Sequence, residues 1–224
     1  MFIPLDCDPD FQRLLEPLDG ERTVPEREQP DGLVQGTTYG LWPDLRLAAY
    51  NAVWLKFSQE NGGEPAISTR WPLGRCILDA IPAPLRPFFI QNYQRCLTEQ
   101  RPWEHAYECS SAQTYREMHM LVLPLGKAEG LVVINSLTRT APHQRTAMLA
   151  HVELYREASG TMTQCCHCRR MRRVDAHEVW EWVPEWVEQQ PETTSHGICE
   201  PCFEFHYHPE RLSSGIRFPI RTGI

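Results

Sequence analysis

The amino-acid sequence predicts an α+β fold: one antiparallel sheet with flanking helices, then a small cysteine-rich module at the C-terminal end. A strand-like segment runs directly into an amphipathic helix at residues 45–60. Three further strand-like segments follow one another between residues 103 and 137. Helical segments separate the two groups, which is the order of an α+β domain and not of repeated βαβ units. Two closely spaced cysteine pairs beyond residue 160 predict the separate module.

Composition limits the classes of function. The 224 residues carry 22 basic and 29 acidic side chains, a formal net charge of -7, which disfavours a uniformly basic nucleic-acid binder but not a local basic patch. No apolar run approaches the roughly 18 residues that a membrane-spanning helix needs. The first residues lack the basic region and apolar run of a secretory signal. We therefore expect a cytoplasmic protein without a membrane partner.

Residues 1–31 have the composition of a flexible leader. They contain nine acidic residues against three arginines, and four prolines. Residues 20–30 in particular offer too little apolar surface to offset the entropy of ordering. A short helix at residues 11–15 is the alternative, because Phe11, Leu14 and Leu15 would share one face and cap the next domain.

The next segment, residues 32–140, contains the sheet and its helices. A helix over residues 51–60 is predicted to follow a strand at 45–50 and to end at the Asn-Gly-Gly of 61–63. A second amphipathic helix is predicted over residues 85–97, with prolines confining its start. The three strands expected after it are residues 103–109, 115–124 and 130–137.

The run Leu-Arg-Leu-Ala-Ala-Tyr-Asn-Ala-Val-Trp at residues 45–54, the helix ending in Asn-Gly-Gly and the closing three-stranded meander resemble a PAS sensory domain. The resemblance implies that Asn51 stands at the first helix and that the sheet wraps a helical side enclosing a ligand cavity or a plain core. The side chains that would line such a cavity are Trp54, Phe57, Phe89, Tyr93, His105 and Met118. The sequence does not identify a ligand for it.

Residues 141–159 are predicted to form a connector helix that begins at Pro142 and stops before Gly160. Met148, Leu149, Val152 and Tyr155 would fall on one stripe of it. Two interpretations stay open: a helix packed back onto the sheet, and a signalling or dimerising connector, for which about two heptads are marginal as a free coiled coil.

The strongest chemical signal lies in residues 160–210, where Cys165 and Cys168 form one C-x-x-C pair and Cys199 and Cys202 form another. This spacing lets two thiolates from one turn occupy neighbouring corners of a tetrahedron, so the four cysteines predict a structural Zn²⁺ site of zinc-ribbon type. Four protein ligands leave no open position for catalysis. Nearby alternative ligands are Cys166, His167 and His196. Residues 211–224 are a C-terminal tail.

An arginine cluster follows the first cysteine pair and would offset the negative charge of the thiolates. It is also a candidate partner-binding surface, made of Arg169, Arg170, Arg172 and Arg173. Between the cysteine pairs, Asp175-x-x-Glu178 has the spacing of a helix capping box, and three tryptophans supply apolar bulk.

The cysteine pairs, the arginines and the tryptophan-rich middle resemble the modules appended to PAS domains in bacterial signalling proteins. No nucleophile elbow, phosphate-binding glycine loop or His-Glu-x-x-His motif is present in the sequence, so an enzyme is not expected. The resemblance implies a non-catalytic sensor whose zinc module contacts a signalling protein, with a homodimer as a further expectation. The alternatives are a DNA-binding regulator that uses the arginine cluster and a thiol-redox switch.

Overall fold

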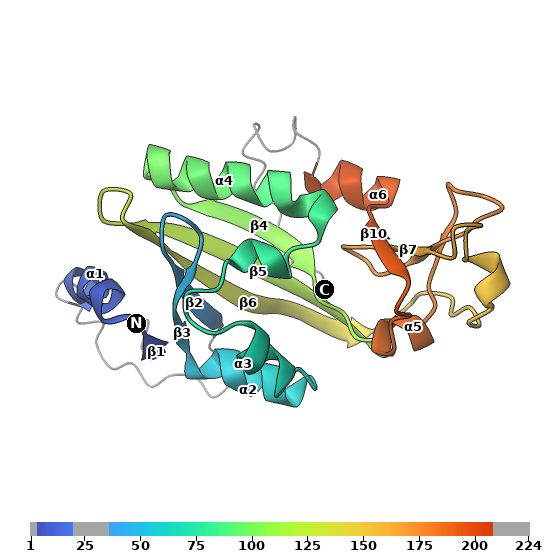
Figure 1. Cartoon of the computed structure of the whole chain (residues 1–224), viewed down its shortest axis with the longest axis horizontal. Coiled ribbons are helices and arrows are strands. Elements are labelled where there is room, and N and C mark those ends of the chain that lie inside the picture. The colour runs from blue at the N-terminus through green and yellow to red at the C-terminus, as the bar shows by residue number, and fades with distance from the viewer. Residues whose placement is uncertain (1–3, 20–35, 208–224) are drawn as a thin grey trace, which may run out of the picture. The chain divides into compact units, whose positions relative to one another are not determined.

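The computed structural model describes residues 4–19 and 36–207, and its chain divides into two compact units (Figure 1). The first unit comprises Met1–Glu108 and Tyr115–Ala141. The second comprises Cys109–Thr114 and Pro142–Ile224. Among the described helices, none is both long enough and apolar enough to cross a bilayer.

A six-stranded sheet forms the centre of the first unit, in the order β1-β3-β2-β6-β5-β4. Its strands are β1 (Pro4–Cys7), β2 (Thr37–Leu41), β3 (Leu47–Asn51), β4 (Trp103–Glu108), β5 (Thr114–Leu125) and β6 (Gly130–Pro142). The pairs β1–β3, β2–β3, β2–β6 and β4–β5 are antiparallel. Strand β2 pairs with β6 from Thr37 opposite Asn135 to Leu41 opposite Leu131. The predicted strands of the meander are therefore present, and β6 is longer than expected.

The helices between β3 and β4 are α2 (Ala52–Glu60), α3 (Ala66–Arg70) and α4 (Arg86–Glu99), with the short turns η1 (Ile77–Ala80) and η2 (Ala83–Leu85) before α4. Asn51 caps α2, because its Oδ1 accepts a hydrogen bond from the Trp54 backbone N–H at 3.1 Å. The same amide accepts from the N–H of Thr38 and donates to the carbonyl of Gly36, each at 3.1 Å. One side chain thus fixes the start of α2 against the start of β2.

One face of the sheet and the inner faces of the helices make the main apolar core. Its members include Leu41, Leu47 and Val133 from the strands and Tyr93 from α4, all buried. Figure 1 shows α4 running along the long strands β4, β5 and β6. The alternation of buried residues along β5 and the helical spacing along α4 carry this core, as the sequence pattern predicts.

The opposite face of the sheet is covered by α1 (Pro9–Asp19). The prediction of a flexible leader is therefore wrong for residues 4–19, and the alternative of a short helix over residues 11–15 that packs on the next domain is confirmed. The Phe11 side chain is fully buried, and a Cβ atom at Gly40 or Gly130 would collide with its ring. Leu15 joins the same cluster. Phe11 and Leu15, one helical turn apart, and the pairing of β1 with β3 hold the acidic segment on the sheet. The rest of the predicted leader, residues 20–31, lies outside the described residues.

A four-stranded sheet with the order β10-β7-β8-β9 organises the second unit. Its strands are β7 (Met162–Cys165), β8 (Met171–Arg172), β9 (Trp180–Glu181) and β10 (Thr194–Gly197). β10 is parallel to β7, and the other pairs are antiparallel. The helical pieces are η3 (Val152–Leu154), α5 (Glu185–Glu188), α6 (Glu200–Cys202) and η4 (Phe203–Tyr207). A small core of Tyr155, Met162, Met171, Val183 and Trp186 lies beside this sheet.

The predicted connector helix over residues 141–159 is wrong. β6 continues through Pro142, and the only helical turn in that range is η3. The backbone of Met148 donates to the carbonyl of Trp182 at 2.8 Å, so its hydrogen bonds go to a neighbouring segment and not to a helix. The apolar side chains that suggested a helical stripe, among them Tyr155 and Val152, pack into the core of the second unit.

The capping-box prediction at Asp175-x-x-Glu178 is also wrong, because no helix begins there: residues 174–175 form a bend and residues 177–178 a turn. Both carboxylate oxygens of Asp175 accept hydrogen bonds from the Arg173 guanidinium, at 2.7 and 2.6 Å. A bidentate ion pair two residues away outcompetes the weaker hydrogen bond to a helix N-terminus.

Candidate metal centre

The first cysteine pair lies on the tight connection between β7 and β8. Cys165 is the last residue of β7, and its N–H donates to the carbonyl of Arg170 at 2.8 Å. Its own carbonyl accepts from the N–H of Arg169 at 2.9 Å. Arg169 has a φ of 61°, the left-handed conformation that reverses the chain after Cys168. This turn brings both sulfurs of the pair to one side.

The second pair is positioned by the parallel pairing of β10 with β7. Gly197 lies opposite Cys165 in this register, and its carbonyl accepts a hydrogen bond from Cys166 N–H at 2.8 Å. Two residues later Cys199 stands in extended backbone as the N-cap of α6, which carries Cys202 at its end. Strand pairing therefore brings together two pairs that are thirty residues apart in the sequence.

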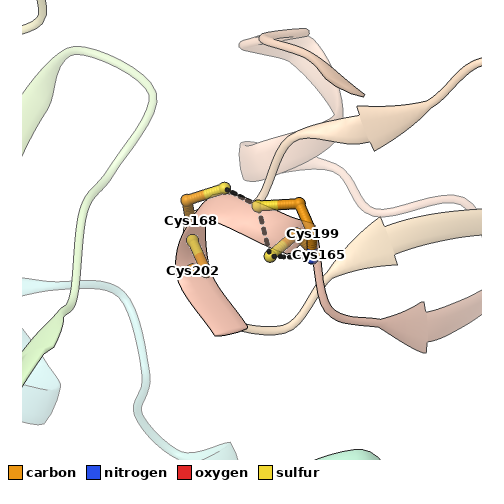
Figure 2. A group of neighbouring side chains, drawn as sticks. All are labelled: Cys165, Cys168, Cys199 and Cys202. Atoms are coloured by element: carbon orange, nitrogen blue, oxygen red, sulfur yellow. Dashed lines mark hydrogen bonds between the residues drawn. The ribbon is translucent and has the colours of Figure 1, made fainter. Parts of the chain in front are cut away.

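Figure 2 shows the four cysteine side chains pointing toward one another. All four sulfurs lie within 4.8 Å of one another; Cys165 Sγ is 3.6 Å and Cys168 Sγ 3.7 Å from Cys199 Sγ. A tetrahedral zinc site with Zn–S bonds of about 2.3 Å requires sulfur separations of about 3.8 Å, whereas a disulfide requires about 2.05 Å. The cysteines are free thiols with exposed fractions between 0 and 8%. The spacing of the sulfurs fits a metal ion.

Electrostatics within this cluster favour a cation. Hydrogen bonds that the other three thiols make with the Cys165 sulfur lower the pKa of Cys165, and the bond with Cys168 has the largest effect. Hydrogen bonds with the neighbouring cysteines, of which the one with Cys165 has the largest effect, raise the pKa of Cys202, and burial raises it further. The N–H of Cys199 also donates to Cys165 Sγ at 3.4 Å. Sulfurs at this separation cannot all be thiolates in a buried site unless a cation lies among them. A divalent ion would remove this conflict by binding every sulfur as thiolate.

The three alternative ligands lie outside the cluster. Nδ1 of His167 is 2.9 Å from the Tyr207 hydroxyl, and its ring stacks on His206 at 4.0 Å. Burial, followed by the effect of His206, lowers the pKa of His167 to about 3. Burial raises the pKa of the Cys166 thiol to about 12. His196 is exposed on β10 and contacts Gln190. Among the described residues, the four cysteines alone form a group of potential metal ligands.

Two members of the arginine cluster are held by acidic side chains of the same unit. Arg172 donates to Glu157 Oε1 at 2.6 Å, and Arg173 binds Asp175 and lies 3.6 Å from Glu181. The charges of these two arginines are therefore partly neutralised within the unit, and the partner-binding surface of four arginines stays a prediction. Arg169 is exposed, and Arg170 is half-buried.

An arginine outside this cluster, Arg145, binds the backbone of the cysteine group through its guanidinium. Arg145 Nη1 donates to the carbonyl of Cys168 at 3.0 Å, and its guanidinium lies 4.7 Å from the centre of the Trp182 ring. Sequence reasoning missed Arg145, because it precedes the first cysteine by twenty residues and belongs to no motif. The sequence offered one indirect indication, the tryptophan-rich segment, because Trp182 in it is the ring that Arg145 packs on.

The predicted cavity-lining residues form two groups in the first unit. Phe89, Tyr93 and His105 are close together, with ring centres 6.0 Å apart for Phe89–Tyr93 and 5.9 Å for Phe89–His105. Trp54 instead packs edge-on against Tyr39, at 5.2 Å. The other two predicted residues are not in either ring group. Phe57 is half-buried on α2, and Met118 is buried on β5. The aromatic groups pack in the apolar core.

Comparison with known proteins adds no family assignment. No protein-family model matches the sequence, and a search of curated proteins found no relative. The functional assignment therefore depends on the geometry of the cysteine cluster and on the order of elements in the first unit.

Proposed function

We propose that the second unit binds one structural zinc ion through Cys165, Cys168, Cys199 and Cys202. The observation that carries this proposal is the meeting of four buried sulfurs at distances that fit a tetrahedral ion. Thiolate ligands in a tetrahedral arrangement favour Zn²⁺ over the harder divalent cations. All four positions are filled by protein, so the ion would stabilise the fold and would not activate water.

The first unit is, in this proposal, a sensory domain of the PAS type. Its order of elements supports this: two strands, a helical segment and a closing meander in one sheet. The contacts of Asn51 add support, because this side chain fixes the strand-to-helix junction through three hydrogen bonds. A ligand or partner that favours one conformer of the sheet would shift the population of conformers presented by the whole chain.

The chain as a whole then acts as a non-catalytic sensory protein whose zinc module contacts a signalling partner. A reducing compartment such as the cytoplasm would keep the four cysteines reduced and available to bind the ion. A DNA-binding role is less well supported, because Arg172 and Arg173 are paired with carboxylates. Binding of duplex DNA at about 50 mM salt, lost steeply as salt rises, would restore that alternative.

Elemental analysis of the protein purified without added metal tests the zinc proposal. We expect one zinc per chain, released by a chelator. Cobalt substitution adds a spectroscopic test, because a four-thiolate site gives intense sulfur-to-cobalt charge-transfer and tetrahedral ligand-field absorption. Cys168→Ser should weaken both signals, and Cys166→Ser is the matched control because Cys166 lies outside the cluster. Equal loss in both variants would contradict the assignment.

Mild peroxide separates a structural site from a thiol-redox switch. A structural site should keep its zinc, because its sulfurs are buried and bound to the ion. Release of zinc together with formation of two disulfides per chain would favour the switch.

A further inference from the structure

The loop that joins β4 to β5 belongs to a different compact unit from the strands it connects. β4 and most of β5 are part of the first unit, whereas Cys109–Thr114 groups with the second. Ser110 and Ala112 within this loop are buried, at 4 and 7% exposure. Hairpin loops usually lie on the surface and are mobile. Burial of this one indicates that the second unit holds it in place.

Backbone groups of the loop are bound by two side chains of the second unit. The N–H of Ala112 donates to Glu188 Oε1 at 3.1 Å. His143 Nε2 lies 2.8 Å from the carbonyl of Ser111, and the backbone N–H of His143 donates to the carbonyl of Gln113 at 3.4 Å. Because a carbonyl oxygen only accepts, Nε2 of His143 carries the proton in this contact.

His143 also begins a continuous series of contacts that ends at a cysteine of the cluster. Its ring centre is 4.4 Å from that of Trp182, which is 3% exposed. The guanidinium of Arg145 lies over the Trp182 ring, 4.7 Å from its centre, and donates to the carbonyl of Cys168 at 3.0 Å. The β4–β5 loop is thus linked to the backbone of Cys168 by three side chains in successive contact: His143, Trp182 and Arg145.

We propose that metal binding at the four cysteines and the order of the β4–β5 loop are coupled through His143, Trp182 and Arg145. The inference rests on the proposed metal site and assigns its regulation. The second unit supplies the required two-state element, because a small metal module folds when its metal is bound. Coupling between two equilibria is reciprocal. A change in the sheet that displaces the loop therefore weakens metal binding, and loss of metal loosens β4 and β5.

Hydrogen exchange of the full chain tests this coupling directly. Zinc-loaded and chelator-treated protein are compared over residues 103–125. We expect the backbone amides of Ala112 and of the adjoining ends of β4 and β5 to exchange faster after zinc removal. The amides of β2, which belongs to the opposite half of the sheet order, are the internal reference and should change less.

A matched pair of variants measures the same coupling from the metal side. His143→Ala removes the contacts to Ser111 and Trp182, whereas His151→Ala removes an exposed imidazole that lies 3.4 Å from Glu153. We expect His143→Ala to raise the zinc Kd roughly 2- to 30-fold, the range found for mutations along coupled networks. His151→Ala should leave the Kd unchanged.

The outcomes separate this inference from the proposed function. Protein that binds zinc, but whose loop amides exchange equally fast with and without it, overturns the coupling and leaves the metal site standing. The same holds if the two histidine variants bind zinc with equal Kd. A chain that binds no metal overturns the metal site and the coupling together.

Discussion

The two units differ in what holds them together. The first has two apolar clusters, one on each face of its sheet, with fully buried members such as Leu41, Leu131 and Phe11. The second has one small apolar cluster around Tyr155 and Met162, and a second cluster made mainly of cysteine sulfurs. Domains below about 70–80 residues rarely gain more than about 3–5 kcal/mol from an apolar core alone. If the proposed zinc site is correct, residues 142–207 should depend on the ion for their stability, whereas the first unit should not.

Loss of a metal ligand should break this contrast most severely. Cys199→Ser removes a thiolate from a site whose zinc contributes an apparent ~10–16 kcal/mol in small metal modules. We expect the second unit to unfold while the sheet of the first unit stays folded. Tryptophan fluorescence and amide exchange of residues 160–207 measure this effect. Cys166→Ser is the control, and unfolding of both variants would show that the cysteine cluster is not the cause.

Phe11→Ala tests the apolar half of the comparison. Its fully buried ring fills the space left by Gly40 and Gly130, so its loss should cost about 3–5 kcal/mol in the first unit, or less if α1 detaches. The midpoint of urea unfolding gives the change, and amide exchange of residues 9–19 shows whether α1 stays on the sheet. The zinc content should not change. An unaltered midpoint would contradict the packing of α1 on the sheet.

Asn51→Ala should have a smaller effect in the same unit. It removes the cap of α2 and two further hydrogen bonds, for a loss of about 0.5–2 kcal/mol from the cap. Asn51→Asp keeps the acceptor for the N–H groups of Trp54 and Thr38 but loses the donor to Gly36. We expect the aspartate variant to lie between wild type and alanine in thermal stability. Equal loss in both variants would assign the effect to the Gly36 contact.

The smallest expected effect is a gain in the second unit. Arg169 adopts a left-handed conformation after Cys168, which costs an L-residue about 1–2 kcal/mol relative to glycine. Part of that gain is lost to the greater backbone entropy of glycine when unfolded. Arg169→Gly should therefore stabilise the zinc-loaded second unit by up to about 1 kcal/mol, measured by the midpoint of thermal unfolding. A loss of stability would show that the arginine side chain has a role of its own.

The sequence predicted the elements whose pattern is local. The spacing of apolar residues along the chain identified α2, α4 and the strands β4 to β6, because that spacing is a property of each segment alone. The spacing within each cysteine pair predicted the cluster, because C-x-x-C geometry is set by one turn. Local pattern sufficed where the structure is determined by neighbours in the chain.

Elements that depend on distant partners were not predictable. Residues 142–158 have a helical stripe, but Met148 binds the backbone of Trp182 and Tyr155 packs against Trp186. Arg145 reaches the carbonyl of Cys168 because that same segment packs against Trp182. Packing of α1 on the sheet likewise depends on Gly40, which is far from it in the sequence. Tertiary contacts outweighed local preference in all three cases.

The metal content of the purified chain, measured together with unfolding of residues 142–207, tests the zinc site most directly. We expect one zinc per chain, and loss of ordered structure in that segment when a chelator removes the ion. Metal-free protein in which these residues remain cooperatively folded would contradict this expectation.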